Sequence, residues 1–483
     1  MKPSTTVLEI CLFMTIVTCA ALANNIAITN LSIKNVNATT ADIEFDLSWS
    51  NSFRWMESVI GNSITNYDAA WVFVKYRVGP LGNWQHALLS SSGHTASPGS
   101  VIEIHSNGSG TNAGAMVYRS DTGTGGIECE NMILRWDMAK NGLARTNYVD
   151  ISVHAIEMVK IPECNYGLGS GGSESSHFYK YPDQLQYYLV TNAGVINVGQ
   201  NTGDLYYSGA GDSLGPIPAA YPNGFSYFYC MKYEITQGQY ADFLNHLPGG
   251  HALARFPNAY GSFRNTIKDT VGVYSADTPD RACNYLMWND VSAYLDWAAL
   301  RPMTELEYEK VCRGPAPPYP NEYAWGDTYI RHIDSYEGID GSGSETAFPT
   351  NANCHYFYER FGNGALFGPT RVGIFARTGT TRREAGAGYY GVMELTGNVE
   401  EQVVGIGNSA GRGFQAVHGD GFVQTAPPTW PTTTGTGQRG GTYCDHYYTI
   451  IDYRLRTSDR AVANSPSPSR SFQVGGRGVR SAQ

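Results

Sequence analysis

One short segment, from Arg439 to Arg454, gathers most of the residue types that could do chemistry: RGGTYCDHYYTIIDYR. A thiol, a carboxylate and an imidazole follow one another at Cys444, Asp445 and His446. A thiol can act as a nucleophile when a base lies nearby, and the fold can bring that base from a distant part of the chain. Cys444 is therefore a candidate catalytic residue, although a buried small side chain or half of a disulfide is the interpretation that we favour for it.

The same segment is rich in tyrosine, which predicts a second use for it. Tyrosine presents a large apolar face with a hydroxyl tip at a low cost in entropy, as adaptable binding surfaces require. We therefore predict a ligand-binding surface whose candidate residues are Tyr443, Asp445, His446, Tyr447, Tyr448, Asp452 and Tyr453. If the segment is a strand, alternate side chains point to opposite faces, so about half of the tyrosines are expected to be buried.

Two other kinds of chemistry are disfavoured by the sequence. It contains no CxxC pair for structural zinc and no HxxxH or HExxH spacing for a catalytic metal. The formal net charge of -10 disfavours nucleic acid as a partner, because phosphate binding needs a basic face.

The N-terminus has the layout of a secretory signal. Lys2 precedes the apolar run ICLFMTIVTCAAL, which predicts a signal peptide over 1–23 that is removed after Ala23. This run is too short to span a bilayer comfortably, and no second run of membrane length follows. We therefore expect a secreted, periplasmic or cell-surface protein without a transmembrane segment; a buried N-terminal helix is the alternative. Of the nine cysteines, Cys11 and Cys19 lie in the signal, and the odd number left over cannot all pair.

The elements that must position the segment fall into two parts. Residues 24–166 alternate short apolar and polar runs, such as ADIEFDLSWS and AAWVFVKYRV, with turn residues between them, which predicts an antiparallel β-sandwich. A linker with connecting strands is expected over 167–221, since it opens with the Gly- and Ser-rich run GLGSGGSESS. Residues 222–483 form the second predicted domain.

Helices are expected only in the first half of the second domain. Thr236 with Gln239, and Thr304 with Glu307, each have the spacing of a capping box at a helix start. A third run of apolar residues at helical spacing follows Asp290. From Gly314 onward the chain is short-period, Gly-rich and irregular, so the expected fold class is α+β and β-rich.

Six ordered motifs in 222–483 resemble one known family. They are FYCMKYEITQGQYADFLN, WNDVSAYLDWAALRPMTELEYEKVCRG, YAWGD, GYYGVMELTGNVEEQV, RGGTY and VGGRGVR. This set resembles the formylglycine-generating enzyme, or sulfatase-modifying factor, domain. The resemblance implies a C-type-lectin-like fold, low in regular structure, for 222–483.

The resemblance does not extend to the catalytic residues. In the enzymes, two cysteines that follow the R-G-G-S strand bind copper and oxidise a substrate cysteine, and soft copper(I) needs such thiolates. In this chain those two positions are Asp445 and Ile450, while Cys444 lies one residue away. The family's GNVWEW reads GNVEEQ over 397–402, without either tryptophan. Copper and cysteine oxidation are therefore not expected.

A calcium site is implied by the resemblance at the same GNV motif. It maps onto the side chain of Asn398, the carbonyl of Val399 and the side chain of Glu401. Oxygen ligands of this kind suit a hard cation. The alternative is that Glu400 and Glu401 are an ordinary pair of solvated carboxylates.

The segment also resembles the variable region of proteins diversified by retroelements. Some of those proteins have this lectin-like fold and a C-terminal variable segment that begins with R-G-G-S. Residues Thr442 to Tyr453 contain no Lys, Gln, Glu, Met or Trp, the bias that adenine-directed mutagenesis of Asn-type codons produces. The resemblance therefore implies a target of a diversity-generating retroelement.

Our hypothesis from the sequence is a secreted or surface-displayed binding protein that recognises a protein or glycan through residues 443–453. The alternatives are an enzyme of the same superfamily with altered active-site residues, which would be an oxidoreductase, and a structural module of a surface assembly.

Overall fold

The computed structural model describes residues 25–59, 62–107, 110–357, 367–377, 379–422, 427, 429–445 and 452–481. The predicted signal peptide lies outside these residues. The described chain is β-rich, and its sheets are almost entirely antiparallel, as the sequence predicts for the fold class. Among these residues no helix has the length and apolar character that a bilayer crossing needs.

The largest sheet contains eleven strands and joins the beginning of the chain to its end. Its main path runs β1-β2-β3-β8-β13-β22-β16, and β4 to β7 pair at its side. The strands are β1 (Ala27–Lys34), β2 (Thr40–Val59), β3 (Asn62–Val78), β4 (Gln85–His86), β5 (Ser100–Ser106), β6 (Asn112–Arg119), β7 (Gly123–Asp137), β8 (Val149–Ile161), β13 (Phe228–Met231), β16 (Arg301–Pro302) and β22 (Gly478–Ser481).

Strand β3 is buried on both faces, which explains its nearly continuous apolar run. On one face Ala70, Val72 and Val74 lie in a core shared with β1, β2, β6, β7 and β8. On the other face Trp71 and Phe73 lie in a second core, together with residues of helices α1 and α3. Because alternate side chains of β3 point to opposite faces, this one strand contributes to two cores.

Short two- and three-stranded sheets make up most of the remaining regular structure. They pair β10 (Tyr179–Lys180) with β12 (Leu205–Tyr206), β9 (Tyr166–Leu168) with β11 (Tyr188–Val190), β14 (Ile267–Thr270) with β15 (Val273–Ala276), β17 (Ser335–Glu337) with β18 (Thr346–Phe348), and β19 (Glu400–Val404) with β20 (Thr436–Arg439) and β21 (Val474–Gly475). The helices are α1 (Gln237–Asn245), α2 (Gly249–Arg255), α3 (Trp288–Trp297), α4 (Glu305–Arg313), α5 (Ser409–Arg412) and the 3-10 helix η2 (Asp452–Leu455).

Both predicted capping boxes are confirmed. Thr236 begins α1 and accepts a hydrogen bond from the backbone of Gln239, whose side chain returns to Thr236. Thr304 and Glu307 make the same pair of bonds at α4. Helix α3 begins at Trp288, two residues before Asp290, because the Asp290 carboxylate accepts a hydrogen bond from the backbone of Met287.

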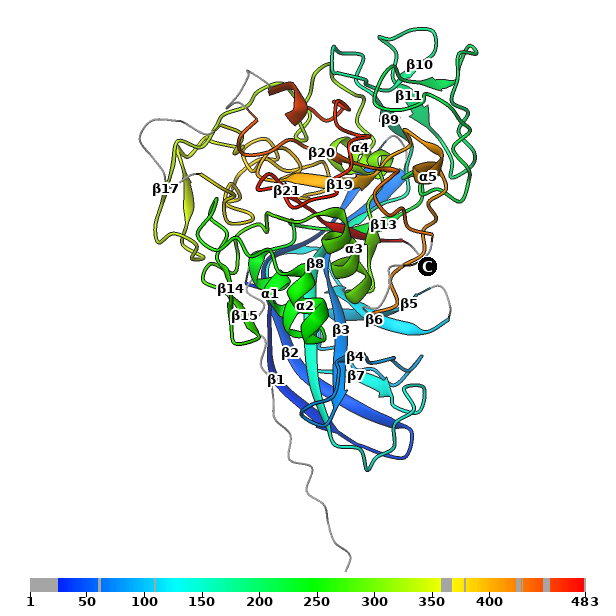
Figure 1. Cartoon of the computed structure of the whole chain (residues 1–483). Coiled ribbons are helices and arrows are strands. Elements are labelled where there is room, and N and C mark those ends of the chain that lie inside the picture. The colour runs from blue at the N-terminus through cyan, green and yellow to red at the C-terminus, as the bar shows by residue number, and fades with distance from the viewer. Residues whose placement is uncertain are drawn as a thin grey trace, which may run out of the picture.

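The N-terminal strands and the C-terminal part share one sheet and one core. In Figure 1 the long strands β1 to β3 and β8 fill the lower part of the view, and most of the chain coloured yellow to red lies above them. Strand β13 pairs with β8 on one side and with β22 on the other. The indole of Trp71 donates to the carbonyl of Ala298, and the Arg480 guanidinium lies 4.2 Å over the Trp71 ring. The domain boundaries at 166 and 222 stay predictions.

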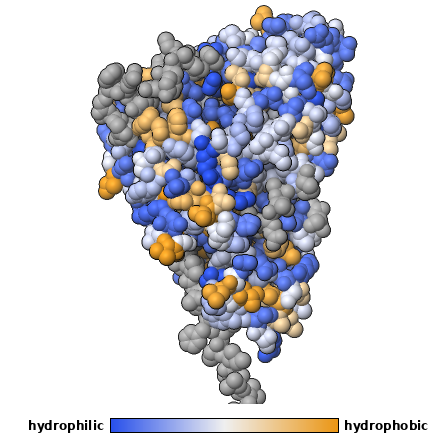
Figure 2. Space-filling model, in the orientation of Figure 1, coloured by the Kyte–Doolittle hydropathy of each residue, from blue (hydrophilic) through white to orange (hydrophobic). Residues whose placement is uncertain are grey.

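The outer surface mixes apolar and polar residues finely. On the face drawn in Figure 2, orange apolar residues stand singly or in small groups among blue hydrophilic ones. Exposed apolar side chains such as Leu81, Leu185 and Val271 are far apart in the chain. Scattered residues of this kind are normal for a water-exposed surface.

Candidate functional site

The segment predicted to do chemistry begins with a tight turn. Strand β20 ends at Arg439, and Gly440 and Gly441 follow with φ of 90° and 69°, in the left-handed region that favours glycine. A β-carbon on Gly441 would overlap the Oδ2 atom of Asp445. That oxygen accepts a hydrogen bond of 2.8 Å from the backbone of Thr442 and closes the turn.

This turn corrects the expectation of a continuous strand. Residues 440–445 contain no strand, so the alternation of faces does not apply to Tyr443, Cys444 and Asp445. The two glycines allow the chain to leave the sheet at once, and the Asp445 carboxylate then takes a backbone donor that a neighbouring strand would have used. All three side chains point inward.

The structure places the first two candidate ligand-binding residues in the interior. Tyr443 is fully buried, and its hydroxyl donates to the carbonyl of Phe472 at 3.2 Å. Asp445 is 6% exposed, and burial raises the pKa of its carboxyl to about 7. In this arrangement Tyr443 and Asp445 therefore support the segment from the protein interior.

The other candidate residues of the segment are only partly covered by the structure. His446, Tyr447, Tyr448 and the family position Ile450 lie outside the described residues. Asp452 and Tyr453 lie in η2, and only the backbone of these two residues is described. Their role in ligand binding stays a prediction.

Cys444 is held in a state that disfavours chemistry. It is 3% exposed, and its sulfur accepts a hydrogen bond from the side chain of Gln473 at 3.2 Å. Burial raises the pKa of the Cys444 thiol to about 12, so the thiolate that a nucleophile or a copper ligand needs is scarce at neutral pH. No disulfide joins Cys444 or the other cysteines of the described chain.

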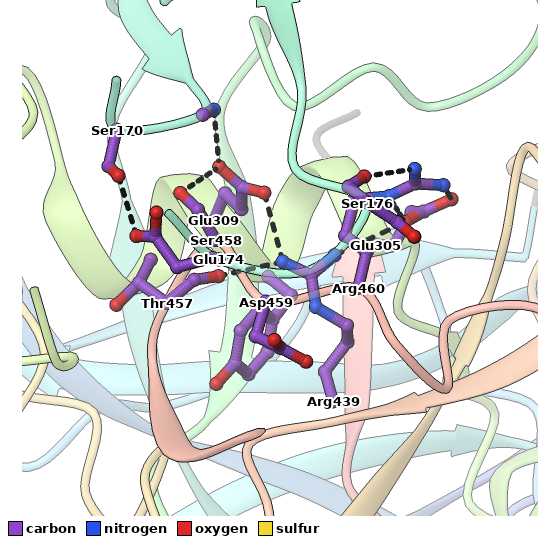
Figure 3. A network of polar contacts seen from close by, with 12 residues as sticks. Ser170, Glu174, Ser176, Glu305, Glu309, Arg439, Thr457, Ser458, Asp459 and Arg460 are labelled. Atoms are coloured by element: carbon purple, nitrogen blue, oxygen red, sulfur yellow. Dashed lines mark hydrogen bonds and ion pairs between the residues drawn. The ribbon is translucent and has the colours of Figure 1, made fainter. Parts of the chain in front are cut away.

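A buried ionic network that the sequence analysis did not predict holds the two ends of the segment (Figure 3). At the start, the Arg439 guanidinium bonds Glu305 at 3.1 Å and Glu309 at 2.9 Å, both on α4. The same guanidinium donates to the carbonyl of Thr457, beyond the end of the segment, at 2.7 Å. Arg439 therefore links the start of the segment directly to its end.

The end of the segment is bound to the same helix. The Arg460 guanidinium bonds Glu305 at 2.7 Å and donates to the carbonyl of Ser176 at 2.9 Å. The hydroxyl of Ser458 accepts from Arg313 and donates to Glu309. We call the set formed by Glu305, Glu309, Arg313, Arg439, Ser458 and Arg460 the α4 clamp. Because these charged groups are buried and mutually paired, the clamp fixes both ends of the segment to one rigid element.

Comparison with known proteins now places the chain in a family. The profile of the sulfatase-modifying factor enzyme 1-like domain matches residues 179–466, which is more than half of the chain. The chain belongs to the sulfatase-modifying factor enzyme 1-like family. No curated protein matches the sequence. Among solved structures, the Treponema denticola variable protein 1 is similar, with a TM-score of 0.33 and 14% identity over 68% of this chain and 96% of that one.

Two buried acids interact beside this turn. One is Asp445, which the sequence resemblance aligns with a catalytic cysteine of the family, and the other is Glu400, on β19, on which the charge of Asp445 acts. Burial, with that charge, raises the pKa of Glu400 to about 8. The alternative that Glu400 and Glu401 are solvated is wrong, since they are only 4% and 1% exposed. The signal in the sequence was the glutamate in place of a tryptophan at position 400.

The residues that the sulfatase-modifying factor family would use for calcium are committed to other partners. The Asn398 side-chain oxygen accepts from the backbone of Thr370 at 2.9 Å. The Glu401 carboxylate is ion-paired with Arg477, whose positive charge opposes a cation at the same oxygens. Among the described residues no three His, Cys, Asp or Glu side chains form a group able to hold a metal. The arrangement does not fit calcium at Asn398, Val399 and Glu401, and calcium binding stays a prediction that requires Arg477 to move.

Proposed function

We propose that the protein binds a protein or glycan ligand outside the cell, through the segment 443–453, and does not act as a cysteine oxidase. The observation that carries this proposal is the α4 clamp. Arg439 and Arg460 hold the two ends of the segment through the same carboxylate, Glu305. Binding loops on a rigid scaffold can change in sequence without loss of the fold, because the scaffold supplies the stability.

The chemistry of the old catalytic position supports the same conclusion. Linear coordination of copper(I) needs two thiolates, and Asp445 and Ile450 supply none. Cys444 is the nearest thiol in sequence, and it is buried and protonated. This chain has the R-G-G turn of the family but not the two thiolates, so it has the scaffold without the residues for copper redox chemistry.

The finer architecture belongs to this proposal. We assign residues 24–166 to a β-sandwich that spaces or anchors the module, and residues 222–483 to a C-type-lectin-like domain. The predicted signal 1–23 would direct the chain to the periplasm, the cell surface or the medium and would then be removed.

A replacement of the segment tests ligand binding. Residues 446–451 would be replaced by a Gly-Ser sequence of equal length, and both proteins would be applied to a glycan array and to a displayed peptide library. We expect the wild-type chain to select specific ligands, and the replaced chain to lose them while its thermal midpoint stays the same. Equal ligand sets for the two proteins would place the binding surface elsewhere.

The rival function is an oxidoreductase that works around Cys444. The purified protein would be incubated with copper and a cysteine-containing sulfatase peptide, and the mass of the peptide would be measured by mass spectrometry. We expect no mass loss. A mass loss that Cys444→Ala abolishes would refute the binding-only function. A defect in surface assembly after deletion of the gene, without any ligand on the arrays, would favour the structural module.

Diversification of the segment is a separate part of the proposal, and the gene tests it. We expect codons 443–453 to vary between clones while the codons of Glu305, Glu309, Arg439 and Arg460 stay constant. A near-copy of the segment should lie beside a reverse-transcriptase gene. Identical codons in all clones, with no copy, would leave a fixed site for one dedicated ligand.

A further inference from the structure

Three buried charged side chains meet where the N-terminal strands join the C-terminal part. Strands β3, β8 and β13 are neighbours in the large sheet (Figure 1), and they carry Asp68, Glu157 and, one residue past β13, Lys232. In the register of β3 with β8, Asp68 lies opposite Val159, two residues from Glu157. The backbone of Lys232 donates to the carbonyl of Glu157. Because opposite residues, and residues two apart on a strand, share a face of the sheet, the three side chains lie together on one face.

The side-chain nitrogen of Lys232 lies between the two carboxylates. Its Nζ atom is 3.1 Å from Oδ2 of Asp68 and 3.2 Å from Oε2 of Glu157. Lys232, Asp68 and Glu157 are only 4%, 0% and 3% exposed. The ring of Phe53 covers Nζ, with its centroid 5.7 Å away. An amine and a carboxyl group are therefore held in contact at a place from which bulk water is excluded.

The two oxygens of the Asp68 carboxyl group have different surroundings. Oδ1 accepts hydrogen bonds from the hydroxyl of Ser52 and the backbone of Phe53, at 2.9 Å each. Oδ2 faces Lys232 and accepts from the indole of Trp49 at 3.1 Å. Two donors on one oxygen stabilise the negative charge that develops there when a nucleophile adds to the carboxyl carbon. Oδ1 is therefore placed to become an amide oxygen, and Oδ2 is placed to leave.

Glu157 supplies the base that such an addition needs. Burial alone would lower the pKa of Lys232, but Tyr233 and the two carboxylates raise it above its ordinary value, so Lys232 is an ammonium ion at rest. An ammonium ion has no lone pair and must lose a proton before its nitrogen can attack. The Oε2 atom of Glu157 is within hydrogen-bond reach of Nζ, as a general base must be.

We propose that Lys232 and Asp68 condense into an isopeptide bond, with Glu157 as the group that transfers the protons. One ammonium proton passes through Glu157 to Oδ2, which makes the carboxyl group electrophilic, and Nζ adds to Cγ of Asp68. A second proton follows the same route, the bond from Cγ to Oδ2 breaks, and Oδ2 leaves as water. The third proton stays on the amide nitrogen. No electrons are exchanged and no co-reactant is needed. Two groups held in contact react at a high effective concentration, which favours this step.

The bond joins the N-terminal strands covalently to the C-terminal part. Asp68 lies on β3, and Lys232 follows β13, so the cross-link spans both predicted domain boundaries. The cysteines of the described chain are free, so no disulfide among them makes this connection. A cross-link between residues far apart in the sequence restricts the unfolded chain and so stabilises the folded one.

The mass of the denatured chain tests whether the bond forms. The chain 24–483 would be expressed, allowed to fold, then denatured and reduced, and we expect its mass to be lower than that of the sequence by one water molecule. A tryptic digest should contain a branched peptide that joins residues 68 and 232 and is not cut after Lys232. A mass equal to that of the sequence would overturn the proposal, and so would a water loss that maps to any other pair of residues.

Two variants separate the bond from a simple ion pair. Lys232→Arg keeps the positive charge without the amine, and Glu157→Gln keeps the shape without the base, so neither should lose water. Lys268→Arg is the matched control, because Lys268 is paired with Asp277 at an exposed site, and it should lose water as the wild type does. Circular dichroism shows whether each variant has folded, and the wild-type mass decides the question even if a variant does not. A folded Glu157→Gln chain that still joins residues 68 and 232 would overturn the role of Glu157.

Discussion

Cys444 shows how one residue position separates a reactive thiol from a structural one. Its side chain points into the protein behind Gln473, and the turn from Gly440 to Asp445 sets that direction. The sequence resemblance aligns a family cysteine with position 445, where the structure has a carboxylate that accepts from the backbone amide of Thr442. Reactivity in this place is therefore decided by local backbone geometry as well as by residue type.

The first prediction concerns the reactivity of Cys444. We expect native protein at pH 8 to be alkylated by iodoacetamide far more slowly at Cys444 than at Cys164, because Cys164 is only partly buried and Cys444 is 3% exposed with a pKa raised to about 12. Mass spectrometry of the digested protein measures both sites. In urea the two should react alike, and equal rates in the native protein would contradict the burial of Cys444.

The second prediction concerns the pH dependence contributed by Glu400 and Asp445. Their pKa values rise from 4.5 and 3.8 to about 8 and about 7 on folding, so the native state holds protons that the unfolded state has released. Stability therefore falls as pH rises from about 4 to about 8, and then levels off. Urea midpoints across this range should fall less steeply in Glu400→Gln, whereas Glu128→Gln, at an exposed position, should follow the wild type. An unchanged slope in Glu400→Gln would show that Glu400 is charged at neutral pH.

At the scale of elements, helix α4 organises the site. One face of this short helix carries Glu305, Glu309 and Arg313, which bind β20, the chain after η2 and each other. The capping box at Thr304 and Glu307 fixes where this helix begins and hence where its carboxylates point. A local sequence signal, the capping box, therefore fixes the helix that holds a segment distant in the chain.

The third prediction tests the α4 clamp. Arg439→Ala removes both ion pairs and leaves Glu305 and Glu309 buried with fewer partners, which should reduce the free energy of unfolding by about 3–5 kcal/mol. Lys268→Ala breaks an exposed pair with Asp277, which water screens, and should leave the free energy of unfolding almost unchanged. Urea denaturation followed by fluorescence measures both. Similar losses in the two variants would mean that the clamp contributes little.

The fourth prediction tests the turn after β20. Gly441→Ala places a β-carbon on a residue in the left-handed region and against Asp445. Backbone strain alone costs about 1–3 kcal/mol, and we expect the free energy of unfolding to fall by more than that. Gly142→Ala is the matched control, since its φ of 71° is nearly the same and the space around it is open. The difference between the two thermal midpoints isolates the overlap with Asp445. Equal shifts in the two variants would mean that Asp445 does not contact residue 441 in the turn.

These elements also show where the sequence was sufficient and where it was not. The starts of α1 and α4 followed from Thr236 and Thr304, since a capping box is a contact between residues three apart. The ion pair of Glu305 with Arg460 joins residues 155 positions apart, and nothing in the local sequence of either residue specifies the other. The turn at Gly440 was missed because the tyrosine-rich pattern after it is also that of a strand.

At the scale of the whole molecule, the N-terminal strands are part of the core of the C-terminal part. The Lys75 side-chain nitrogen, Nζ, donates to the carbonyls of Trp297 and Gly421, at 2.6 Å each. Lys232, next to β13, is ion-paired with Asp68 of β3 and Glu157 of β8. These buried contacts cross the predicted boundary, so neither side has a complete core without the other.

The fifth prediction follows from this shared core. Calorimetry of the mature chain should show one unfolding transition, because unfolding either part exposes the apolar core around Trp71 and Trp297. Residues 222–483 expressed alone should aggregate, since β13 would lose its partner β8. Two separate transitions, or a stable isolated fragment, would show that the parts fold independently.

The clamp around α4 has a last consequence, for the length of the segment it holds. Arg439 and Thr457 are joined directly, so the chain between them is a loop whose ends are already closed by the scaffold. The entropy cost of a flexible closed loop grows only slowly, by about 0.6 kcal/mol for each doubling of its length. Insertions and deletions between Asp445 and Asp452, outside the buried turn, are therefore expected to be tolerated almost as well as substitutions, which gives the module a second way to vary.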